Sequence, residues 1–287
     1  MGRIAYVNGL YVPHGEASVH VEDRGYQLAD GVYEVWAIMD GRLADAEGHF
    51  VRLERSLGEL RIPMPMGRAA LQIVLHEMIR RNRVTEGLVY LQVTRGVAPR
   101  DHAFPTQPVK PAIAITAKSI DSQAAQAKAA EGIAVVTTPE TRWARCDIKT
   151  VALLPNVLAK QAARERGAAE AWFVDELGLV TEGASSNAWI VDQDGVLRTR
   201  DLNANILRGI TRKSLLELIQ AEGLACIEAP FTPDEAKAAR EAFISSAGNL
   251  IAPVVRIDGV AIGDGKPGPI ATRLRALYLA HARQTAA

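Results

Sequence analysis

The chain has 287 residues, with 33 Lys and Arg against 33 Asp and Glu, and 48% of its residues are hydrophobic. This length suits one large domain or two modest ones, and the hydrophobic fraction is that of a globular protein. A net charge of zero argues against a nucleic-acid-binding or membrane-surface protein, because phosphate recognition needs an excess of basic residues. It fits better an enzyme that acts on small molecules.

Cysteine content and hydropathy bear on the compartment. Cys146 and Cys226 are the only cysteines, too few for a disulfide framework, and they indicate a reducing environment. No apolar run reaches the roughly 18 residues that a membrane span needs. The N-terminus has no hydrophobic signal core, since Arg3, Asn8 and Gly9 interrupt it. We therefore expect a cytoplasmic protein without a membrane span.

The first third of the chain predicts strands and two helices. Asn8-Gly9 predicts a hairpin between Arg3–Val7 and Leu10–Val12, because both turn positions tolerate positive φ. Gly31–Met39 is strand-like, with Val32, Glu34, Trp36 and Ile38 on one face and Tyr33, Val35 and Ala37 on the other. Two helical stripes follow. The first consists of Phe50, Leu53, Leu57 and Leu60 and is ended by Pro63 and Pro65, and the second consists of Leu71, Val74, Leu75 and Met78. Further strands are predicted at Leu88–Thr94 and Ala112–Ala117.

The second half mixes strands and helices. Asp121–Glu131 is rich in Ala and Gln with little apolar bulk, and we expect an interdomain linker there, a short helix being the alternative. We predict a small α/β domain at 1–120, the linker at 121–131 and a larger domain at 132–287. Strands are predicted at Ile133–Thr138, Ala171–Asp175, Asn187–Val191 and Ala242–Ser245, and helices near Asn156–Arg166, Thr211–Ala221 and Ile270–Arg283. The class is α+β or mixed α/β, and no G-x-G-x-x-G follows a strand to support a dinucleotide fold.

Two segments carry candidate catalytic groups. Lys149 stands between Ile148 and the apolar run Val151–Leu154, which indicates partial burial. Burial lowers the pKa of a lysine and makes its amine a usable nucleophile for Schiff-base chemistry, although a lysine beside a strand is more often solvated. In Val180–Asn187, Glu182 precedes small polar residues between two strand-like runs. Such a loop brings a carboxylate and backbone N–H groups to a ligand, but taken alone an ordinary turn is favoured.

Two further segments could bind anions. Gly209 and Thr211 precede the helical stretch near Leu215–Leu218, and a helix start with free N–H groups is a ready phosphate site; a simple Thr cap is the alternative. Arg100 and His102 lie in a loop shaped by prolines and could converge on a carboxylate, or could be solvated. The six histidines show no metal-ligand spacing, and no G-x-S-x-G motif supports a serine hydrolase.

Together these segments resemble the fold-type IV pyridoxal-phosphate enzymes, a branched-chain-aminotransferase-like superfamily, and most closely the bacterial D-amino-acid aminotransferases. The resemblance runs nearly end to end. Its motifs are Asp23–Gln27 with Asp30–Val35, Arg52 in His49–Leu53, Tyr90–Gly96 with Pro99–His102, Arg142–Lys149, and Thr181–Gly183 with Ser185–Asn187. It implies a smaller N-terminal α/β domain, a larger barrel-like C-terminal domain of mixed α/β structure, and a homodimer.

The resemblance also implies the activity. This is the transfer of the amino group of D-amino acids to a 2-oxo acid, of the D-alanine and 2-oxoglutarate type, with pyridoxal 5′-phosphate and ping-pong aldimine and ketimine chemistry. The catalytic residue is Lys149, which forms the Schiff base and moves the proton from the substrate Cα. Glu182 keeps the pyridine nitrogen protonated, which makes the ring a better electron sink.

The same resemblance assigns two sets of binding residues, and it assigns no metal. The cofactor set is Lys149, Glu182, Arg52, Leu207, Gly209, Ile210, Thr211, Ser246, Ala247, Ser186 and Asn187. Within it, Leu207 packs against the ring, and Arg52, Ile210, Thr211 and the Ser246–Ala247 turn hold the phosphate. The substrate set is Tyr33, Arg100, His102, Tyr90 and Val35, of which the first three bind the α-carboxylate.

The sequence departs from the family pattern at three positions. Ala247 stands where relatives often have threonine, so a side-chain contact with the phosphate would be lost there. Ala184 replaces a serine of the D-type pattern. Asp101 lies within the carboxylate loop, where a small residue is usual, and we expect it to face solvent because an inward, unpaired carboxylate would repel the substrate.

Other activities share the lysine and phosphate motifs. A branched-chain L-amino-acid aminotransferase lacks the arginine-x-histidine pair that Arg100 and His102 form, whereas an (R)-selective amine transaminase stays open as a side activity. An aminodeoxychorismate lyase would need a different pocket. A homologue that binds without catalysis is disfavoured by the intact Lys149, Glu182 and Arg52.

Overall fold

The structure is a computed structural model that describes residues 2–202 and 206–287, and its chain divides into two compact units. Unit 1 comprises Met1–Asp121 together with two short returning segments, Ile148–Ala152 and Thr285–Ala287. Unit 2 comprises Ser122–Asp147 and Leu153–Gln284. The segment predicted as a linker forms helix α4 (Ser122–Glu131) of unit 2, which is the alternative that its alanine content allowed.

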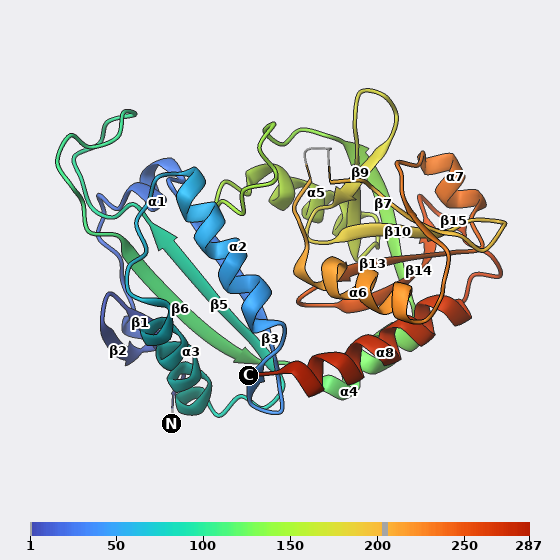
Figure 1. The fold of residues 1–287 in the computed structure, drawn as a ribbon. Coiled ribbons are helices and arrows are strands. Elements are labelled where there is room, and N and C mark those ends of the chain that lie inside the picture. Colours follow the sequence, from blue (N-terminus) through green and yellow to red (C-terminus); the bar gives the residue numbers. More distant parts are fainter. Residues whose placement is uncertain (1, 203–205) are drawn as a thin grey trace. The chain divides into compact units, whose positions relative to one another are not determined.

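Unit 1 is built on a six-stranded antiparallel sheet of order β2-β1-β6-β5-β3-β4 (Figure 1). Its strands are β1 (Ile4–Val7), β2 (Leu10–Pro13), β3 (Gly31–Met39), β4 (Arg42–Leu43), β5 (Gly87–Thr94) and β6 (Ala112–Ser119). Its helices are the one-turn 3-10 helix His14–Glu16, α1 (Arg24–Leu28), α2 (Ala46–Glu59) and α3 (Arg68–Asn82). The Asn8-Gly9 hairpin is confirmed, with φ values of 49° and 103° that fit a turn needing two positive φ angles.

Helices α2 and α3 cover one face of this sheet and bury the apolar stripes that predicted them (Figure 1). Leu53, Leu57, Leu71 and Leu75 are at most 1% exposed, and each contributes about 1.5–3 kcal/mol of hydrophobic burial. Helix α2 ends at Glu59, before Leu60, because Arg61 takes a left-handed conformation that turns the chain.

Unit 2 contains a nine-stranded mixed sheet of order β12-β11-β10-β13-β14-β7-β8-β9, with β15 paired to β14. Its strands are β7 (Ile133–Pro139), β8 (Glu170–Val174), β9 (Val180–Gly183), β10 (Asn187–Val191), β11 (Leu197–Thr199), β12 (Cys226–Glu228), β13 (Glu241–Ser246), β14 (Leu250–Ile257) and β15 (Val260–Ala261). Besides α4, its helices are α5 (Leu154–Glu165), α6 (Ile210–Ala221), α7 (Pro233–Ala238) and most of α8 (Pro269–Thr285). The predicted mixed α and β class is confirmed.

Strand β8 is buried on both faces, which explains its uninterrupted apolar run. Ala171 and Phe173 pack with α5, whereas Trp172 belongs to the cluster that includes Phe231. Cys146 and Cys226 are both free thiols. Within the described ranges, no helix has the length and apolar character needed to cross a membrane.

Candidate active site

Strand β3 distributes two kinds of residue to its two faces. Tyr33 and Val35 are half-buried, and the Tyr33 ring stacks on Tyr90 of β5 with centroids 5.6 Å apart. Val35 lies opposite Tyr90 in the antiparallel register. Three of the predicted substrate-binding residues therefore share one face of the sheet, while Glu34 points to the opposite, fully buried face.

The main chain of Lys149 is hydrogen-bonded to strand β3, which carries Tyr33. The amide of Tyr33 donates a 2.9 Å hydrogen bond to the Lys149 carbonyl, and Val32 forms a bridge with Thr150. The buried Ile148 anchors the segment in the core of unit 1. Lys149 is half-buried, as its apolar flanks predicted, and its Nζ lies 4.1 Å from the Tyr33 ring centroid. The segment thus presents an amine on an aromatic surface.

Arg52 lies on the other face of β3, in a buried cluster with Glu34 and His49. Its Nε and Nη2 donate to the two Glu34 oxygens at 2.6 and 2.8 Å, and His49 Nδ1 lies 2.8 Å from Glu34 Oε2. Burial alone would raise the pKa of Glu34, but Arg52 and then His49 outweigh it and lower that pKa to about 2. Glu34 is therefore ionised at neutral pH and fixes the guanidinium of Arg52.

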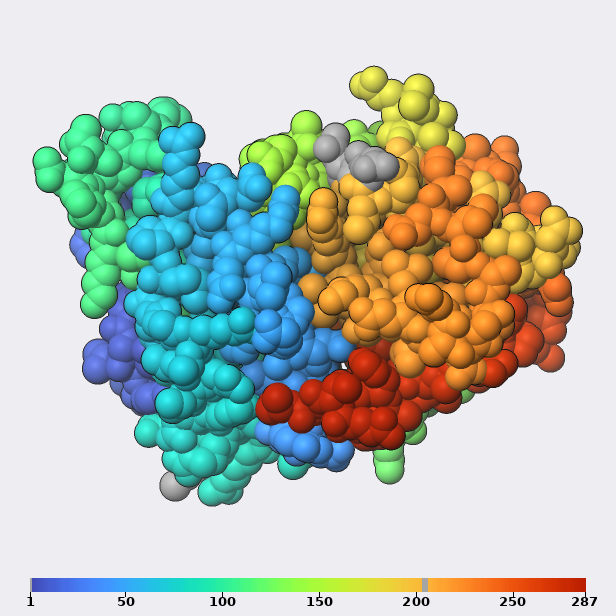
Figure 2. Space-filling view, viewed as in Figure 1, coloured from blue at the N-terminus to red at the C-terminus, as the bar shows by residue number. Residues whose placement is uncertain are grey.

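The loop that carries Arg100 and His102 extends from unit 1 at the molecular surface (Figure 2). Both side chains are exposed, and within the described residues neither is hydrogen-bonded or ion-paired with Tyr33. Asp101 is also exposed, and its carboxylate accepts a 3.2 Å hydrogen bond from the amide of Ala103. The prediction that Asp101 faces solvent is confirmed.

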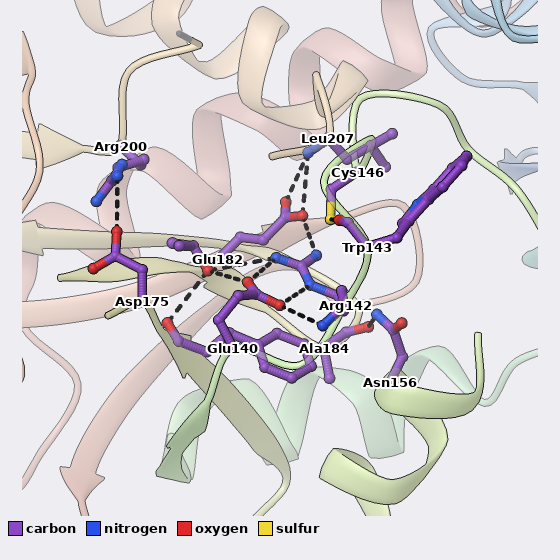
Figure 3. A network of polar contacts seen from close by, with 12 residues as sticks. Glu140, Arg142, Trp143, Cys146, Asn156, Asp175, Glu182, Ala184, Arg200 and Leu207 are labelled. Carbon is purple, nitrogen blue, oxygen red and sulfur yellow. Dashed lines mark hydrogen bonds and ion pairs between the residues drawn. The ribbon is translucent and has the colours of Figure 1, made fainter. Parts of the chain in front are cut away.

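In unit 2, Glu182 is a buried carboxylate surrounded by donors (Figure 3). Asn187 Nδ2 donates to Oε2 at 3.1 Å, and the amide of Leu207 lies 3.1 and 3.2 Å from the two oxygens. Asn187 Nδ2 also donates to the Leu207 carbonyl at 3.2 Å. Three residues predicted to bind the cofactor therefore meet in one hydrogen-bonded group.

Two members of the polar network around Glu182, Arg142 and Glu140, were not predicted from the sequence. Arg142 donates Nη1 to Glu182, and it donates Nε and Nη2 to Glu140 at 2.9 and 2.6 Å (Figure 3). Burial would raise the pKa of Glu140, but Arg142 outweighs it and lowers that pKa. One guanidinium thus binds two carboxylates. The local Glu-x-Arg spacing was the only sequence signal for this network.

The first turn of α6 has the features of an anion site. Its N-cap is Gly209, without a side-chain cap among the described residues, and Ile210 and Thr211 are buried. A Cβ on Gly209 would lie 2.0 Å from Asn187 Oδ1, so only glycine fits here. The N–H groups of this turn are thereby held next to the residue that also binds Glu182, and they suit a phosphate.

The remaining predicted cofactor residues lie at strand ends of unit 2. Ser186 donates its hydroxyl to Glu170, which is fully buried and also accepts from Ser185 at 2.7 Å. Ser246 ends β13, and its Oγ accepts from the amide of Asn249. Ala247 follows it without a hydroxyl, as the sequence showed.

Ala184, the second departure from the family pattern, has a structural explanation. It packs in the apolar cluster that α5 forms with β7 and β8, where it is 6% exposed. Its carbonyl accepts a 2.8 Å hydrogen bond from Asn156. A buried methyl group therefore takes the place of a serine hydroxyl.

The donors of unit 2 fit parts of a phosphorylated pyridine ring, with a buried carboxylate for a ring cation and a helix start without a side-chain cap for a phosphate. Unit 1 by itself offers a half-buried lysine of the kind that reacts with an aldehyde. The fold and these groups define a pyridoxal-phosphate enzyme. The chain belongs to the amino-transferase class IV family, whose model matches residues 31–257.

Individual relatives agree with this family. The chain is 41% identical over 271 residues to the D-alanine aminotransferase of Staphylococcus haemolyticus, covering 94% of each chain. It is 41% identical over 263 residues to that of Bacillus licheniformis, covering 92% of this chain and 91% of the relative. Its fold is similar to that of the branched-chain amino acid aminotransferase of Escherichia coli, with a TM-score of 0.90, 24% identity and coverage of 99% and 96%. The pyridoxal-phosphate-bound form of a hypothetical aminotransferase from Mycobacterium tuberculosis gives a TM-score of 0.84 at 22% identity, over 98% and 99% of the two chains.

A substitution at Arg142 tests the electrostatics of the Glu140–Arg142–Glu182 network. The Arg142 side chain is 7% exposed, and Arg142→Met would leave the buried Glu182 and the half-buried Glu140 without their cation. We expect the free energy of unfolding to fall by about 3–5 kcal/mol, measured by urea denaturation.

The matched control is Arg145→Met, in the same segment. The Arg145 side chain is 47% exposed and pairs with Asp147, so its loss should cost at most about 1 kcal/mol. Equal losses in the two variants would contradict a buried, charge-dependent network.

Proposed function

We propose that this protein transfers the amino group of D-amino acids to a 2-oxo acid acceptor with pyridoxal 5′-phosphate as cofactor. The observation that carries the proposal is the 41% identity, over 94% of both chains, to the D-alanine aminotransferase of Staphylococcus haemolyticus. The arginine-x-histidine loop at Arg100 and His102 supports the D-amino-acid assignment. The branched-chain enzyme of Escherichia coli shares the fold at 24% identity, which by itself does not favour a branched-chain substrate.

We propose roles for the cofactor-binding residues that the family resemblance implies and that their hydrogen bonds support. The bound cofactor supplies an electron sink for the substrate Cα. The Glu182 carboxylate holds a proton on the ring nitrogen, and Asn187 and Leu207 orient that carboxylate. The first turn of α6, at Ile210 and Thr211, binds the phosphate through its N–H groups, with Arg52 and the Ser246–Ala247 turn as further donors. Leu207 packs on the ring, and Ser186 supports this strand end through Glu170.

The roles of the reacting residues complete the assignment. Lys149 binds the cofactor covalently, and its Nζ removes the proton from the substrate Cα. Tyr33, Arg100 and His102 bind the α-carboxylate, and Tyr90 and Val35 line the substrate side of the sheet. With the carboxylate fixed and the base fixed, only one enantiomer directs its Cα–H to the lysine.

The spectrum of the purified holoenzyme tests the function. D-alanine should bleach the cofactor absorbance of the parent, and L-alanine should not. Borohydride reduction and mass spectrometry should find the cofactor on Lys149.

Lys149→Ala should lose the adduct and the activity, because no other amine replaces it. Lys118→Ala, which changes an exposed lysine of unit 1, should keep both. Activity of Lys149→Ala within tenfold of the parent would contradict the assignment of Lys149 as the catalytic residue.

Arg100→Ala tests the carboxylate loop. Loss of the guanidinium should raise KM for D-alanine and cost about 2–4 kcal/mol in transition-state binding. An (R)-amine donor without a carboxylate should lose less. The measurement is kcat/KM for D-alanine, L-alanine and the (R)-amine. Equal losses for all donors, or a parent that prefers L-alanine, would show that the loop does not bind the carboxylate.

We further propose that the enzyme works as a cytoplasmic homodimer. The two free thiols support a reducing compartment. Helix α5 carries an exposed apolar stripe, with Leu154, Val157 and Leu158 68%, 59% and 62% exposed, and helix spacing places the three on one face. An apolar stripe of this kind marks an interaction surface, and a second copy is the occupant that the family resemblance suggests.

Light scattering tests the dimer. The parent should have twice the 31.0 kDa chain mass, and a Val157→Glu, Leu158→Glu double variant should shift toward monomer because charge replaces the apolar stripe. Leu177→Glu is the control, since Leu177 is 81% exposed but lies in the turn between β8 and β9 and not on helix α5. A fully active monomeric parent would refute the proposal.

A further inference from the structure

We propose that a buried cluster in unit 1, formed by Arg24, Asp30 and Arg95 and here called the loop clamp, determines donor specificity by holding the loop of Arg100 and His102 in position. The inference rests on the proposed function, in which that loop binds the substrate carboxylate. The members of the clamp are positioning residues that act through the loop.

Arg24 connects the core to the loop backbone. Its side chain is 2% exposed, at the start of α1, where Asp23 caps the helix. Its Nε donates to Asp30 Oδ2 at 2.8 Å, and its Nη1 donates to the carbonyl of Asp101 at 2.6 Å. Asp101 is the residue between Arg100 and His102, so this hydrogen bond holds the backbone at the centre of the proposed trap.

Arg95 holds the same loop from a second point. Its Nε and Nη2 donate to the two Asp30 oxygens at 2.7 and 3.0 Å, and its guanidinium lies 3.7 Å from the Phe104 ring centroid. It also donates to the carbonyls of Leu60 and Arg61, next to the end of α2. The loop is therefore attached to the clamp on both sides of His102, at Asp101 and at Phe104.

The charge of the clamp explains why the loop is held. One carboxylate faces two buried guanidiniums. Burial would raise the pKa of Asp30, but Arg95 and Arg24 outweigh it and lower that pKa. Asp30 is thus ionised, and one excess positive charge stays in the cluster. A desolvated guanidinium needs acceptors for its donors, and the Asp101 carbonyl is one of them.

A fixed backbone matters for this loop because its side chains are not packed. Arg100, Asp101 and His102 are all exposed, so their positions depend on the main chain that carries them. Two donors converge on one carboxylate only if their spacing is preserved, and preorganisation of this kind raises affinity by removing an ordering cost. The clamp supplies that preorganisation.

Arg24→Lys tests the clamp in the holoenzyme. A lysine keeps the charge but lacks the planar fork that reaches Asp30 and Asp101 together. We expect kcat/KM for D-alanine to fall about 10–100-fold, mainly through KM. The donor D-alaninol, in which a hydroxymethyl group replaces the carboxylate, should change less than about threefold. Arg55→Lys, at a partly exposed residue of α2 that pairs with Glu59, is the control and should change neither.

A second variant and a second measurement keep the test independent of any one substitution. Phe104 is 49% exposed, so Phe104→Ala should fold normally and shift specificity in the same direction by a smaller factor. Hydrogen exchange by mass spectrometry should show faster exchange of the segment 99–104 in both variants, without faster exchange of β3 or β5.

The outcomes separate this inference from the function on which it rests. If Arg100→Ala changes the ratio of D-alanine to D-alaninol activity, but Arg24→Lys and Phe104→Ala leave both that ratio and the exchange of the loop unchanged, the clamp is refuted and the function stands. Equal losses for both donors in Arg24→Lys would show a merely structural role and also overturn the inference. No effect of Arg100→Ala would instead refute the proposed carboxylate trap itself.

Discussion

The charged groups of the candidate site depend on one constraint, that a buried carboxylate must be paired. Glu34 is held by Arg52, Asp30 by Arg24 and Arg95, and Glu182 by Arg142. An unpaired buried ion costs several kcal/mol, whereas a paired one with its remaining hydrogen bonds satisfied holds a fixed geometry. Arg52, Glu182 and the substrate loop, which are proposed to bind the ligands, are therefore held by ion pairs or hydrogen bonds with side chains that have no proposed ligand contact.

Successive side chains of strand β3 point to opposite faces of the sheet. The proposed substrate-binding residues and the residue that fixes Arg52 therefore lie on different faces. Residues at odd positions, Tyr33 and Val35, form the half-buried aromatic face that Lys149 joins. The even position, Glu34, turns to the core side and fixes Arg52 of α2. A slip of one residue in the register with β5 would exchange the faces and bury the tyrosine while exposing the carboxylate. The packing of Val32 and Trp36 in the core makes that register stable.

Periodicity predicted the elements well where one face is buried, as in β3 and α2. It missed β14, because Pro253 lies inside that strand and is read as a breaker, yet tertiary pairing with β13 holds the strand in the sheet. In the site, Lys149 and Glu182 were singled out as candidates from their local sequence, and the resemblance to family motifs then gave them their proposed roles. Arg142, Glu140 and Glu170 were not singled out, because their pairing joins residues up to 41 positions apart, which no local pattern encodes.

Two clusters contain unequal numbers of acidic and basic groups, and the sign of the excess suits the group proposed to bind nearby. In unit 2, Arg142 is shared between Glu140 and Glu182, so one guanidinium faces two carboxyl groups. If Arg142 faced Glu182 alone, the pair would be neutral and would stabilise a ring cation poorly; Glu140 occupies two of its donors and preserves the negative character of Glu182. In unit 1, two guanidiniums around Asp30 leave one excess positive charge behind a loop proposed to bind an anion. Each cluster thus carries the sign opposite to the group that its neighbouring residues are proposed to bind, and that bias is built into the apoprotein.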